Sequence, residues 1–208
     1  MKRDYDINRT VQPIRTEKDR KAISRYLRSK SLRDYALFEF GLRVGRRVSD
    51  LVNLNVGDVA RLDRRGRLVI RNRLMCQEKK TNKFSDILIN QFARRVLSRY
   101  LTERKAQSEN LTALLDEPLF YSRTSGSNGE HRLSRKRVWE ILKEAGDACE
   151  LDYKIGTHSL RKTFGYDLHR RGVDITLIQK ALNHSSPEIT LAYIGITQND
   201  IDAAMKRL

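Results

Sequence analysis

Four residues in the last third of the chain carry side chains that could act together on an anion: His158, Arg161, His184 and Tyr193. His158 and Arg161 are three positions apart, a spacing that places two side chains next to each other on a helix. Such a pair forms a ready anion site, because the guanidinium offers a fork of N–H donors. Each residue taken singly has an ordinary explanation as an ion pair, a helix end or a half-buried ring. It is therefore their combination that predicts chemistry.

Three helices are expected to position these residues. The first should start near Thr157 or Ser159 and stop at Gly172, which has the character of a C-terminal glycine cap. Its apolar face has three members spaced four apart: Leu160, Phe164 and Leu168. Asp174 should cap the second helix, whose apolar residues are Leu177, Ile178, Ala181 and Leu182.

The third helix should carry Tyr193 near its C-terminal end. It opens with Ser185-Ser186-Pro187-Glu188, in which proline suits the first helical turn. With Ser185 as the cap, Glu188 would complete a capping box. His184 would then lie in the turn just before this helix.

The order His158-x-x-Arg161, then Leu182-x-His184, then Tyr193 nine residues later resembles the C-terminal signature of the tyrosine recombinases, the phage integrase family. Residues 45–51 (Gly-Arg-Arg-Val-Ser-Asp-Leu) are similar to the first box of that family, Gly-Leu-Arg-x-Ser-Glu-Leu. The Ser-Asp-Leu register assigns the first catalytic arginine to Arg47.

Two positions of the first box depart from the usual form, since Arg46 stands where leucine is usual and Asp50 where glutamate is commoner. Arg43 follows a similar Gly-Leu pair and is the alternative to Arg47, but Ser-Asp-Leu does not follow it. A helix from about Ser31 to Val44 should precede the box. Gly45 then allows a sharp turn. Ser49 is expected to cap a short helix, which leaves Arg47 on a tight connection.

Residues 68–73 and 84–89 are predicted strands, because they are rich in β-branched residues and partly alternate. A basic hairpin tip, residues 77–83, lies between them. The resemblance implies a mobile hairpin here whose lysine enters the active site. Lys80, followed by Thr and Asn, fits that role, and Lys79 and Lys83 are the alternatives.

The resemblance also implies how the six candidate catalytic residues divide the work. Tyr193 would be the nucleophile on a DNA phosphodiester, with Arg47 and Arg161 stabilising the charge that builds on the phosphate. His158 would manage the proton of the nucleophile, Lys80 would protonate the departing 5′-oxygen, and His184 would donate a hydrogen bond to the phosphate. The product would be a 3′-phosphotyrosine, so no ATP, metal or other cofactor is expected.

The charge balance predicts a polyanionic partner. The chain has 208 residues and a formal net charge of +16, with an isoelectric point near 10.1. Double-stranded DNA is favoured over a membrane surface, because the basic residues are spread along the chain and no run approaches the roughly 18 apolar residues of a membrane span. Beyond the catalytic set, the expected DNA contacts are Arg46, Lys79, Lys83, Arg135, Lys136, Arg137 and Lys162.

Arg135, Lys136 and Arg137 follow Ser134, the expected cap of a helix that runs to about Cys149. Cations in a first turn oppose the helix dipole, which a phosphate partner would explain as well as plain surface charge does. The chain begins without an export signal, and its two cysteines have no metal spacing. A cytoplasmic, nucleoid-associated protein of prokaryotic, phage or mobile-element origin is expected.

The expected fold class is α+β, mainly helical with a small antiparallel sheet or hairpin. Residues 1–15 are expected to be a flexible segment and residues 16–208 a tyrosine recombinase catalytic domain, with helices starting at Thr16 and running over about 91–105. Most family members carry a further N-terminal domain that clamps DNA, so the chain resembles a short, stand-alone recombinase for integration, excision or inversion. A DNA-binding regulator and a type IB topoisomerase-like relaxase are the alternatives.

The C-terminus is expected to form a last helix with an apolar stripe: Ile201, Ala204, Met205 and Leu208. Such a stripe must be buried, either on its own domain or on a neighbouring protomer. The resemblance favours exchange with a neighbour, and hence a monomer or weak dimer in solution and a tetramer on paired sites. Accessory DNA-binding proteins are a further candidate class of partner.

Overall fold

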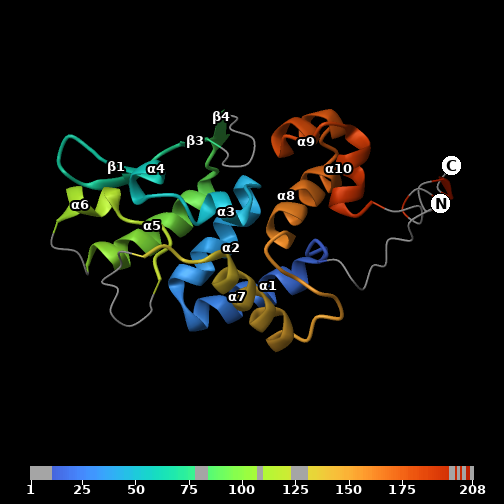
Figure 1. Cartoon of the computed structure of the whole chain (residues 1–208), viewed down its shortest axis with the longest axis horizontal. Helices are drawn as coiled ribbons and strands as arrows, with labels where there is room; N and C mark the ends of the chain where they lie inside the picture. The colour runs from blue at the N-terminus through green and yellow to red at the C-terminus, as the bar shows by residue number, and fades with distance from the viewer. Residues whose placement is uncertain are drawn as a thin grey trace.

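The computed structural model describes residues 11–77, 84–106, 110–122 and 131–196, together with residues 200, 202, 205 and 206. Helices dominate, and the strands form two separate antiparallel pairs (Figure 1). The helices are α1 (Glu17–Lys30), α2 (Leu32–Val44), α3 (Val48–Leu51), α4 (Val56–Val59), α5 (Gln91–Lys105), α6 (Leu111–Asp116), α7 (Arg135–Ala148), α8 (Ser159–Arg170), α9 (Ile175–Leu182) and α10 (Pro187–Ile194). The strands are β1 (Ala60–Leu62), β2 (Leu68–Ile70), β3 (Arg73–Gln77) and β4 (Phe84–Leu88).

Helix α2 lies at the centre of the larger part of the molecule and packs against α1, α5 and α8. Nearly all of its residues are buried, including Phe38 and Phe40, so it forms the axis of the main hydrophobic core. The predicted helix boundaries are confirmed here. The Thr16 and Ser31 side chains cap α1 and α2, and Gly45, with φ 62°, ends α2 in the left-handed conformation.

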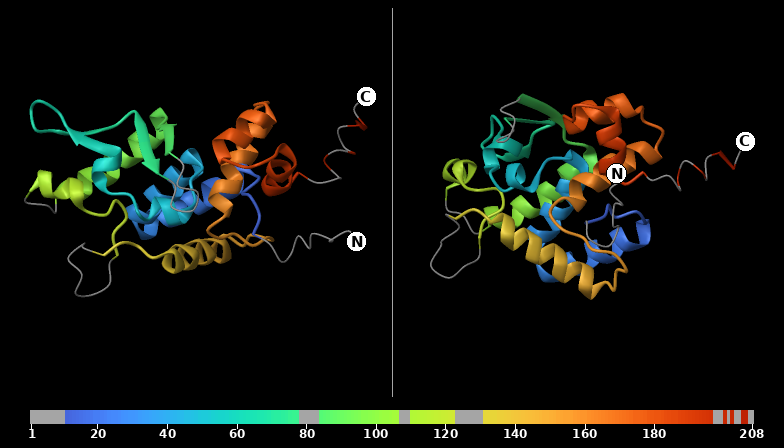
Figure 2. Two further views of the ribbon diagram at one scale, coloured as in Figure 1. Left: turned by 45° about the horizontal axis from the view of Figure 1, so that its top comes forward. Right: turned by 45° about the vertical axis from the view of Figure 1, so that its right-hand side comes forward.

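A second, smaller core joins α8, α9 and α10, with Ile178, Leu182 and Ile194 buried between them. Gly165 lets these helices approach closely, since a Cβ atom added there would lie 2.6 Å from Ile194 Cγ2. Figure 2 shows α8 running from the main body to this small cluster. Helix α8 therefore fixes the position of Tyr193 relative to the rest of the chain.

The predicted strand over residues 68–73 is wrong in its extent, because this segment belongs to two different sheets. Residues 68–70 are β2 and pair with β1, whereas Arg73 begins β3 and pairs with Leu88 of β4. The chain passes from one sheet to the other at Arg71 and Asn72. The backbone N–H of Arg71 still bonds to Val59 O, at 2.8 Å. The hairpin that joins β3 to β4 is where the sequence predicts it, but residues 78–83 lie outside the described residues.

Two of the expected helix caps are off by one or two residues. Helix α3 begins at Arg47 as its cap rather than at Ser49, because the Arg47 carbonyl accepts hydrogen bonds from Asp50 N at 2.9 Å and Leu51 N at 3.0 Å. Helix α10 is capped by Ser186 rather than Ser185. Proline stands at the first helical position, where its missing N–H is not needed, so the residue directly before it becomes the cap. The predicted capping box with Glu188 therefore does not form.

Of the remaining expectations about helices, some are confirmed and others are not. Asp174 and Ser134 cap α9 and α7 as predicted. Of the apolar residues expected on α9, Ile178 and Leu182 are fully buried, whereas Leu177 is 56% exposed. The short helices α4 and α6 were not predicted. Of the expected terminal stripe, Ile201, Ala204 and Leu208 lie outside the described residues and Met205 is 64% exposed.

Residues 11–15 are packed on the domain rather than forming part of a flexible segment. Ile14 is fully buried, and its backbone N–H bonds to Thr163 Oγ1 of α8 at 2.8 Å. Gln12 N bonds to Lys154 O at 2.9 Å. The first described residues are thus attached to the helix that carries Arg161. Within the described part of the chain, no helix has the length and apolar character needed to span a membrane.

Candidate active site

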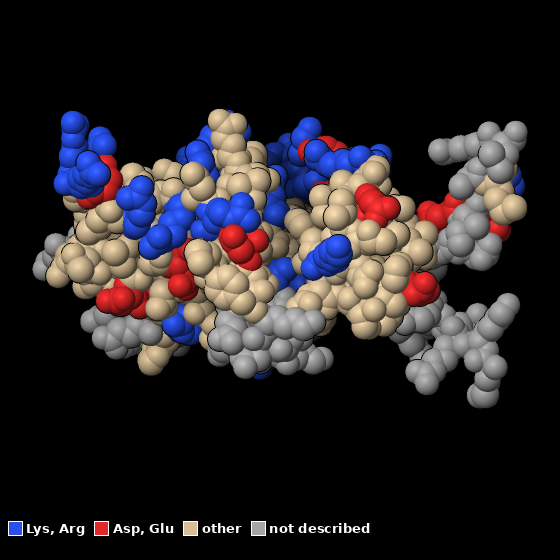
Figure 3. Space-filling view, turned by 90° about the horizontal axis from the view of Figure 1, so that it is seen from above, with Lys and Arg blue, Asp and Glu red and all other residues tan. Residues whose placement is uncertain are grey.

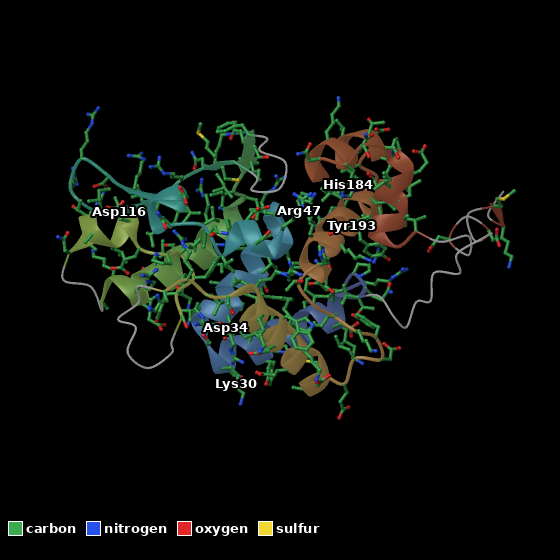
Figure 4. The ribbon with its side chains drawn as sticks, viewed as in Figure 1. Lys30, Asp34, Arg47, Asp116, His184 and Tyr193 are labelled. Atoms are coloured by element: carbon green, nitrogen blue, oxygen red, sulfur yellow. The ribbon has the colours of Figure 1, made fainter. Side chains whose placement is uncertain are left out.

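Five of the six predicted catalytic residues come together from three distant parts of the chain. Arg47 follows α2, His158 and Arg161 lie at the start of α8, and His184 and Tyr193 belong to the α9–α10 turn and to α10. In Figure 4, Arg47 lies on the side of α3 that faces α8 and α10, with His184 and Tyr193 opposite. The sixth residue, Lys80, lies outside the described residues, as do Lys79 and Lys83.

Arg161 is the innermost member of the group, with 1% of its surface exposed. Its Nη1 donates to the carbonyl of Gly45 at 2.8 Å, and its Nη2 donates to the carbonyl of Leu182. These carbonyls close the C-terminal ends of α2 and α9, where a cation is favoured by the helix dipole. Arg161 therefore ties the segment before Arg47 to the segment before His184.

Tyr193 is close to both histidines. Its hydroxyl oxygen lies 3.3 Å from His158 Nδ1, and its ring centroid lies 4.9 Å from that of His184 in an edge-on arrangement. Burial raises the pKa of the Tyr193 phenol, and the charges of Arg161 and Arg47 act in the opposite direction. The phenol is therefore protonated at neutral pH, and as a nucleophile it would first have to lose its proton.

His158 is suited to accept that proton. Although His158 is an exposed residue, partial desolvation of its ring is the main cause that lowers the pKa of the imidazole, and nearby cations, first Arg135 and then Lys162, Arg161 and Arg47, lower it further. The neutral imidazole is therefore favoured at pH 7, and a neutral ring nitrogen 3.3 Å from a phenol can act as a base.

His184 is held by the turn that it occupies. Its Nδ1 lies 3.1 Å from Thr190 Oγ1, and that hydroxyl in turn donates to Ser186 O at 3.0 Å. Because the threonine proton is used on Ser186, Nδ1 of His184 is the donor in the first bond. Its Nε2, on the other edge of the ring, then carries a proton only when the ring is an imidazolium.

The structure favours Arg47 over Arg43 for the first arginine of the site. Arg47 is half-buried and acts electrostatically on both His158 and Tyr193. The Arg43 guanidinium instead bonds to the Glu39 carboxylate and lies 3.9 Å from the ring centroid of Phe92. Arg43 is therefore engaged on the α2–α5 side of the core.

The remaining predicted DNA contacts differ in their environments. Lys162 lies 5.6 Å from the ring centroid of Tyr193, and burial, assisted by Arg15, lowers its pKa. Arg135 is close enough to His158 to act on its titration. Both therefore belong to the site.

Lys136 is exposed. The other two predicted contacts, Arg137 and Arg46, are engaged within the protein. Arg137 forms ion pairs with Glu140 at 3.0 Å and Glu144 at 3.3 Å. Arg46 was predicted to contact DNA, but it is only 4% exposed and its guanidinium bonds within the protein. Its burial corrects the expectation of a solvent-facing contact.

Arg15 is a member of the site region that the sequence gave no reason to select. Its Nη2 donates to Gly195 O at 2.7 Å, directly after the helix of Tyr193, and its guanidinium lies 5.3 Å from the ring centroid of Tyr166. Only the packing of residues 11–15 against α8 and α10 brings it there. No local pattern in the sequence signals such a contact.

The face that includes the two strand pairs and α9 is strongly basic. Figure 3 looks onto this face and shows many more Lys and Arg than Asp and Glu side chains. The segment from β1 to the start of β3 contributes exposed arginines at six positions: Arg61, Arg64, Arg65, Arg67, Arg71 and Arg73. Among the described residues, no group of three or more His, Cys, Asp or Glu could hold a metal ion.

Comparisons with known proteins agree on one family. The model of the phage integrase family matches residues 15–200. A probable integrase/recombinase, YoeC of Bacillus subtilis, is 40% identical over 196 residues, covering 94% of this chain and 96% of that protein. The tyrosine recombinase XerA of Pyrococcus furiosus is 29% identical over 205 residues, covering 99% of this chain but only 65% of the relative.

Solved structures show the same fold. A crystal structure of XerA recombinase superposes with a TM-score of 0.70 at 24% identity, covering 95% of this chain and 66% of that chain. XerH recombinase in a post-cleavage complex with its difH substrate gives a TM-score of 0.65 at 21% identity, covering 91% of this chain and 49% of that chain. The chain thus spans about half to two thirds of these longer proteins.

The environment of His158 predicts a depressed imidazole pKa, below the ordinary value of about 6.5. Replacing Arg135 with glutamine removes a cation that opposes the imidazolium, so the pKa of His158 should rise towards that value. NMR titration of the His158 ring protons measures both.

Arg137→Gln is the matched control, because Arg137 lies on the same helix but is paired with Glu140 and Glu144. It should leave the titration of His158 unchanged. A wild-type midpoint at or above the ordinary value, or equal midpoints in wild type and Arg135→Gln, would contradict this electrostatic account.

Proposed function

Because the chain belongs to the phage integrase family, we propose that it is a site-specific DNA recombinase that cleaves and rejoins strands through Tyr193. The observation that carries the proposal is the 3.3 Å approach of the Tyr193 hydroxyl to His158 Nδ1, beside Arg161 and Arg47. A nucleophile, a base and two guanidinium groups at one point are the parts that a phosphoryl transfer requires.

In the proposed cleavage step, the Tyr193 oxygen attacks the phosphorus of a DNA phosphodiester and transfers its proton to His158. A Tyr–O–P bond forms and the P–O5′ bond breaks, and the departing 5′-oxygen takes a proton from a lysine of the hairpin, for which Lys80 is the candidate. The strand end is held as a 3′-phosphotyrosine. Attack by a 5′-hydroxyl of another strand reverses the step, so the bond energy is retained without ATP.

Arg161, Arg47 and His184 are assigned the role of stabilising the negative charge that develops on the phosphate oxygens. Arg161 is held in place by two backbone carbonyls, so little reorganisation is needed when the charge appears. The His184 ring is oriented by Thr190 and donates from Nε2 as an imidazolium, a form that an adjacent phosphate stabilises.

Double-stranded DNA is the proposed substrate, bound along the basic face. Phosphate contacts supply most of the affinity of such a positively charged protein and set its register without reading sequence. Lys162, Arg135 and Lys136 are proposed backbone contacts close to the scissile phosphate. Arg46 is left out of this set because it is buried.

We further propose that the active form is a tetramer on two paired sites, assembled from a monomer or weak dimer, with the C-terminal segment exchanged between protomers. A surface hollow of about 1030 Å³ lies between residues 11–15, α7 and residues 151–155, and Asp200 of this chain's own C-terminal segment also lines it. In the exchanged form, the segment of a neighbouring protomer would take that place. Trp139, 44% exposed, stands in this hollow and offers a large apolar surface. Accessory DNA-binding proteins would act on the assembled complex.

Tyr193→Phe should abolish covalent attachment to DNA and leave DNA affinity nearly unchanged, because only the attacking oxygen is removed. The substrate is a pool of random-sequence duplexes with a nick, from which cleavage releases a short strand and traps the adduct. Protein-linked DNA is recovered after denaturation and sequenced, which also identifies the target site.

Tyr166→Phe is the control, since Tyr166 lies on α8 and has its ring against Arg15. It should form the adduct at the wild-type rate. Covalent adduct in Tyr193→Phe would sink the proposal, and a wild-type adduct without strand exchange would point to a relaxase instead.

Arg47→Ala should lower the rate of adduct formation by about 10²–10³-fold, the usual loss for one transition-state donor, with a much smaller change in affinity. Arg43→Ala removes an arginine engaged with Glu39 and Phe92, so the chemical step should be nearly unaffected. Single-turnover rates on the trapped site measure both. An inactive Arg43→Ala beside a fully active Arg47→Ala would transfer the role to Arg43.

Truncation after Ile196 should leave binding and cleavage of a single site intact and remove four-protomer complexes on paired sites. This end point keeps the Arg15 bond to Gly195 O, so the setting of α10 is preserved. Gel mobility on one site and on two sites separates the two properties. Lys206→Ala, an exposed change in the removed segment, should assemble normally. Tetramers formed by the truncated chain would show that the segment does not couple the protomers.

A further inference from the structure

Arg46 occupies an unusual place for a charged residue. It stands directly before Arg47, where the first box of the family usually has leucine, and it is 4% exposed. Its Nη1 donates to Ser85 Oγ of β4 at 2.9 Å, and its Nη2 donates to Ala181 O of α9 at 2.7 Å. One side chain therefore connects the β3–β4 pair to the end of the helix that precedes His184.

The second contact joins an arrangement already made by Arg161. Ala181 and Leu182 are consecutive residues at the end of α9, and their carbonyls are bound by Arg46 and Arg161 respectively. Two guanidinium groups thus hold the C-terminal end of one helix, where the backbone carbonyls lack partners within the helix and the dipole favours cations. Directly beyond them the chain turns at Asn183, with φ 54°, into His184.

Two hydrogen bonds join His184 to Gln179 of α9. His184 N bonds to Gln179 O at 3.0 Å, and Gln179 Nε2 bonds to His184 O at 3.2 Å. Both bonds lie within the turn itself, so they cannot set its position relative to Arg47. Arg46 and Arg161 connect it to the α2–α3 segment, and Figure 1 shows β4 and α9 facing each other above α3 and α8.

We propose that Arg46 is a positioning residue that holds the α9–α10 turn, and with it His184, in register with Arg47 and β4. The proposal rests on the function proposed above, since it assigns Arg46 a part in the same reaction. Arg46 does not contact the phosphate. It acts through the Ala181 carbonyl and the Ser85 hydroxyl.

Arg46→Leu restores the residue that the family pattern has at this position, so the fold should tolerate it. Removing the buried charge removes its desolvation cost, which offsets part of the cost of leaving Ala181 O without this donor. What leucine cannot supply is a donor to Ala181 O, so the turn should loosen. The amides of Asn183 and His184 should then exchange with solvent faster in Arg46→Leu than in wild type, as measured by hydrogen exchange.

The rate of adduct formation should fall about 10- to 100-fold in Arg46→Leu, because small displacements of a catalytic group cost rate. DNA affinity should change by less than about twofold, because no phosphate contact is lost. Ser85→Ala, which removes only the β4 partner at a half-exposed position, should give a smaller loss of rate in the same direction.

Arg104→Leu is the matched control, since Arg104 is 6% exposed and bonds to Pro118 O at 2.6 Å, on the α5–α6 side of the core. It should leave both the adduct rate of folded protein and the exchange of the His184 amide unchanged. A double-mutant cycle with His184→Ala then tests the route of the effect. If Arg46 acts by placing His184, the loss caused by Arg46→Leu should be much smaller in the His184→Ala background.

Three outcomes would overturn the proposal: unchanged exchange at Asn183 and His184, an unchanged adduct rate in Arg46→Leu, or fully additive losses in the cycle. Failure of the proposed function is distinguished from these, because wild type would then form no adduct at all. The hydrogen-exchange comparison would still decide whether Arg46 holds the turn.

Discussion

The structure depends on the placement of one buried guanidinium, that of Arg161, between the carbonyls of Gly45 and Leu182. An unpaired buried charge would cost several kcal/mol, so the two helix ends that supply these carbonyls must meet at this point. Glycine is needed at position 45 for two reasons. Its φ of 62° ends α2 in the left-handed conformation, and the Phe164 ring packs so close to it that a side chain would not fit. The positions of Arg47, His184 and Tyr193 all follow from that junction.

The site is consequently a group of like charges assembled before any anion is bound. Arg47, Arg161, Lys162 and Arg135 all disfavour the imidazolium of His158, and burial disfavours the phenolate of Tyr193. Both groups are therefore neutral at pH 7, which is the protonation state that proton transfer from the phenol to the imidazole requires. The same cations favour a phosphate, so in the proposed reaction substrate binding and the neutral state of His158 have one electrostatic origin.

Sequence reasoning could select the candidate site because its signals are local. The spacing of His158 and Arg161 on one helix, and the capping residues Thr16 and Ser134, need only neighbouring positions to be understood. The division of residues 68–73 between two sheets could not be predicted in this way, since it depends on which distant strand offers a hydrogen-bonding edge. The burial of Arg46 was hidden for the same reason: its acceptors are 39 and 135 positions away.

Arg15, close to the first described residues, contacts the chain just after α10 and two residues beyond Tyr193, and this contact bears on the proposed assembly. Arg15 binds Gly195 O, and residues 11–15 also line the hollow beside Trp139. A segment that docked in that hollow would press on the same residues that hold the end of α10. Because Arg15 also lowers the pKa of Lys162, whose ammonium lies over the Tyr193 ring, a shift of residues 11–15 would change the charge around the nucleophile as well as its position. Under the proposed exchange, docking in this hollow would reach the proposed nucleophile through a few N-terminal residues rather than through the core.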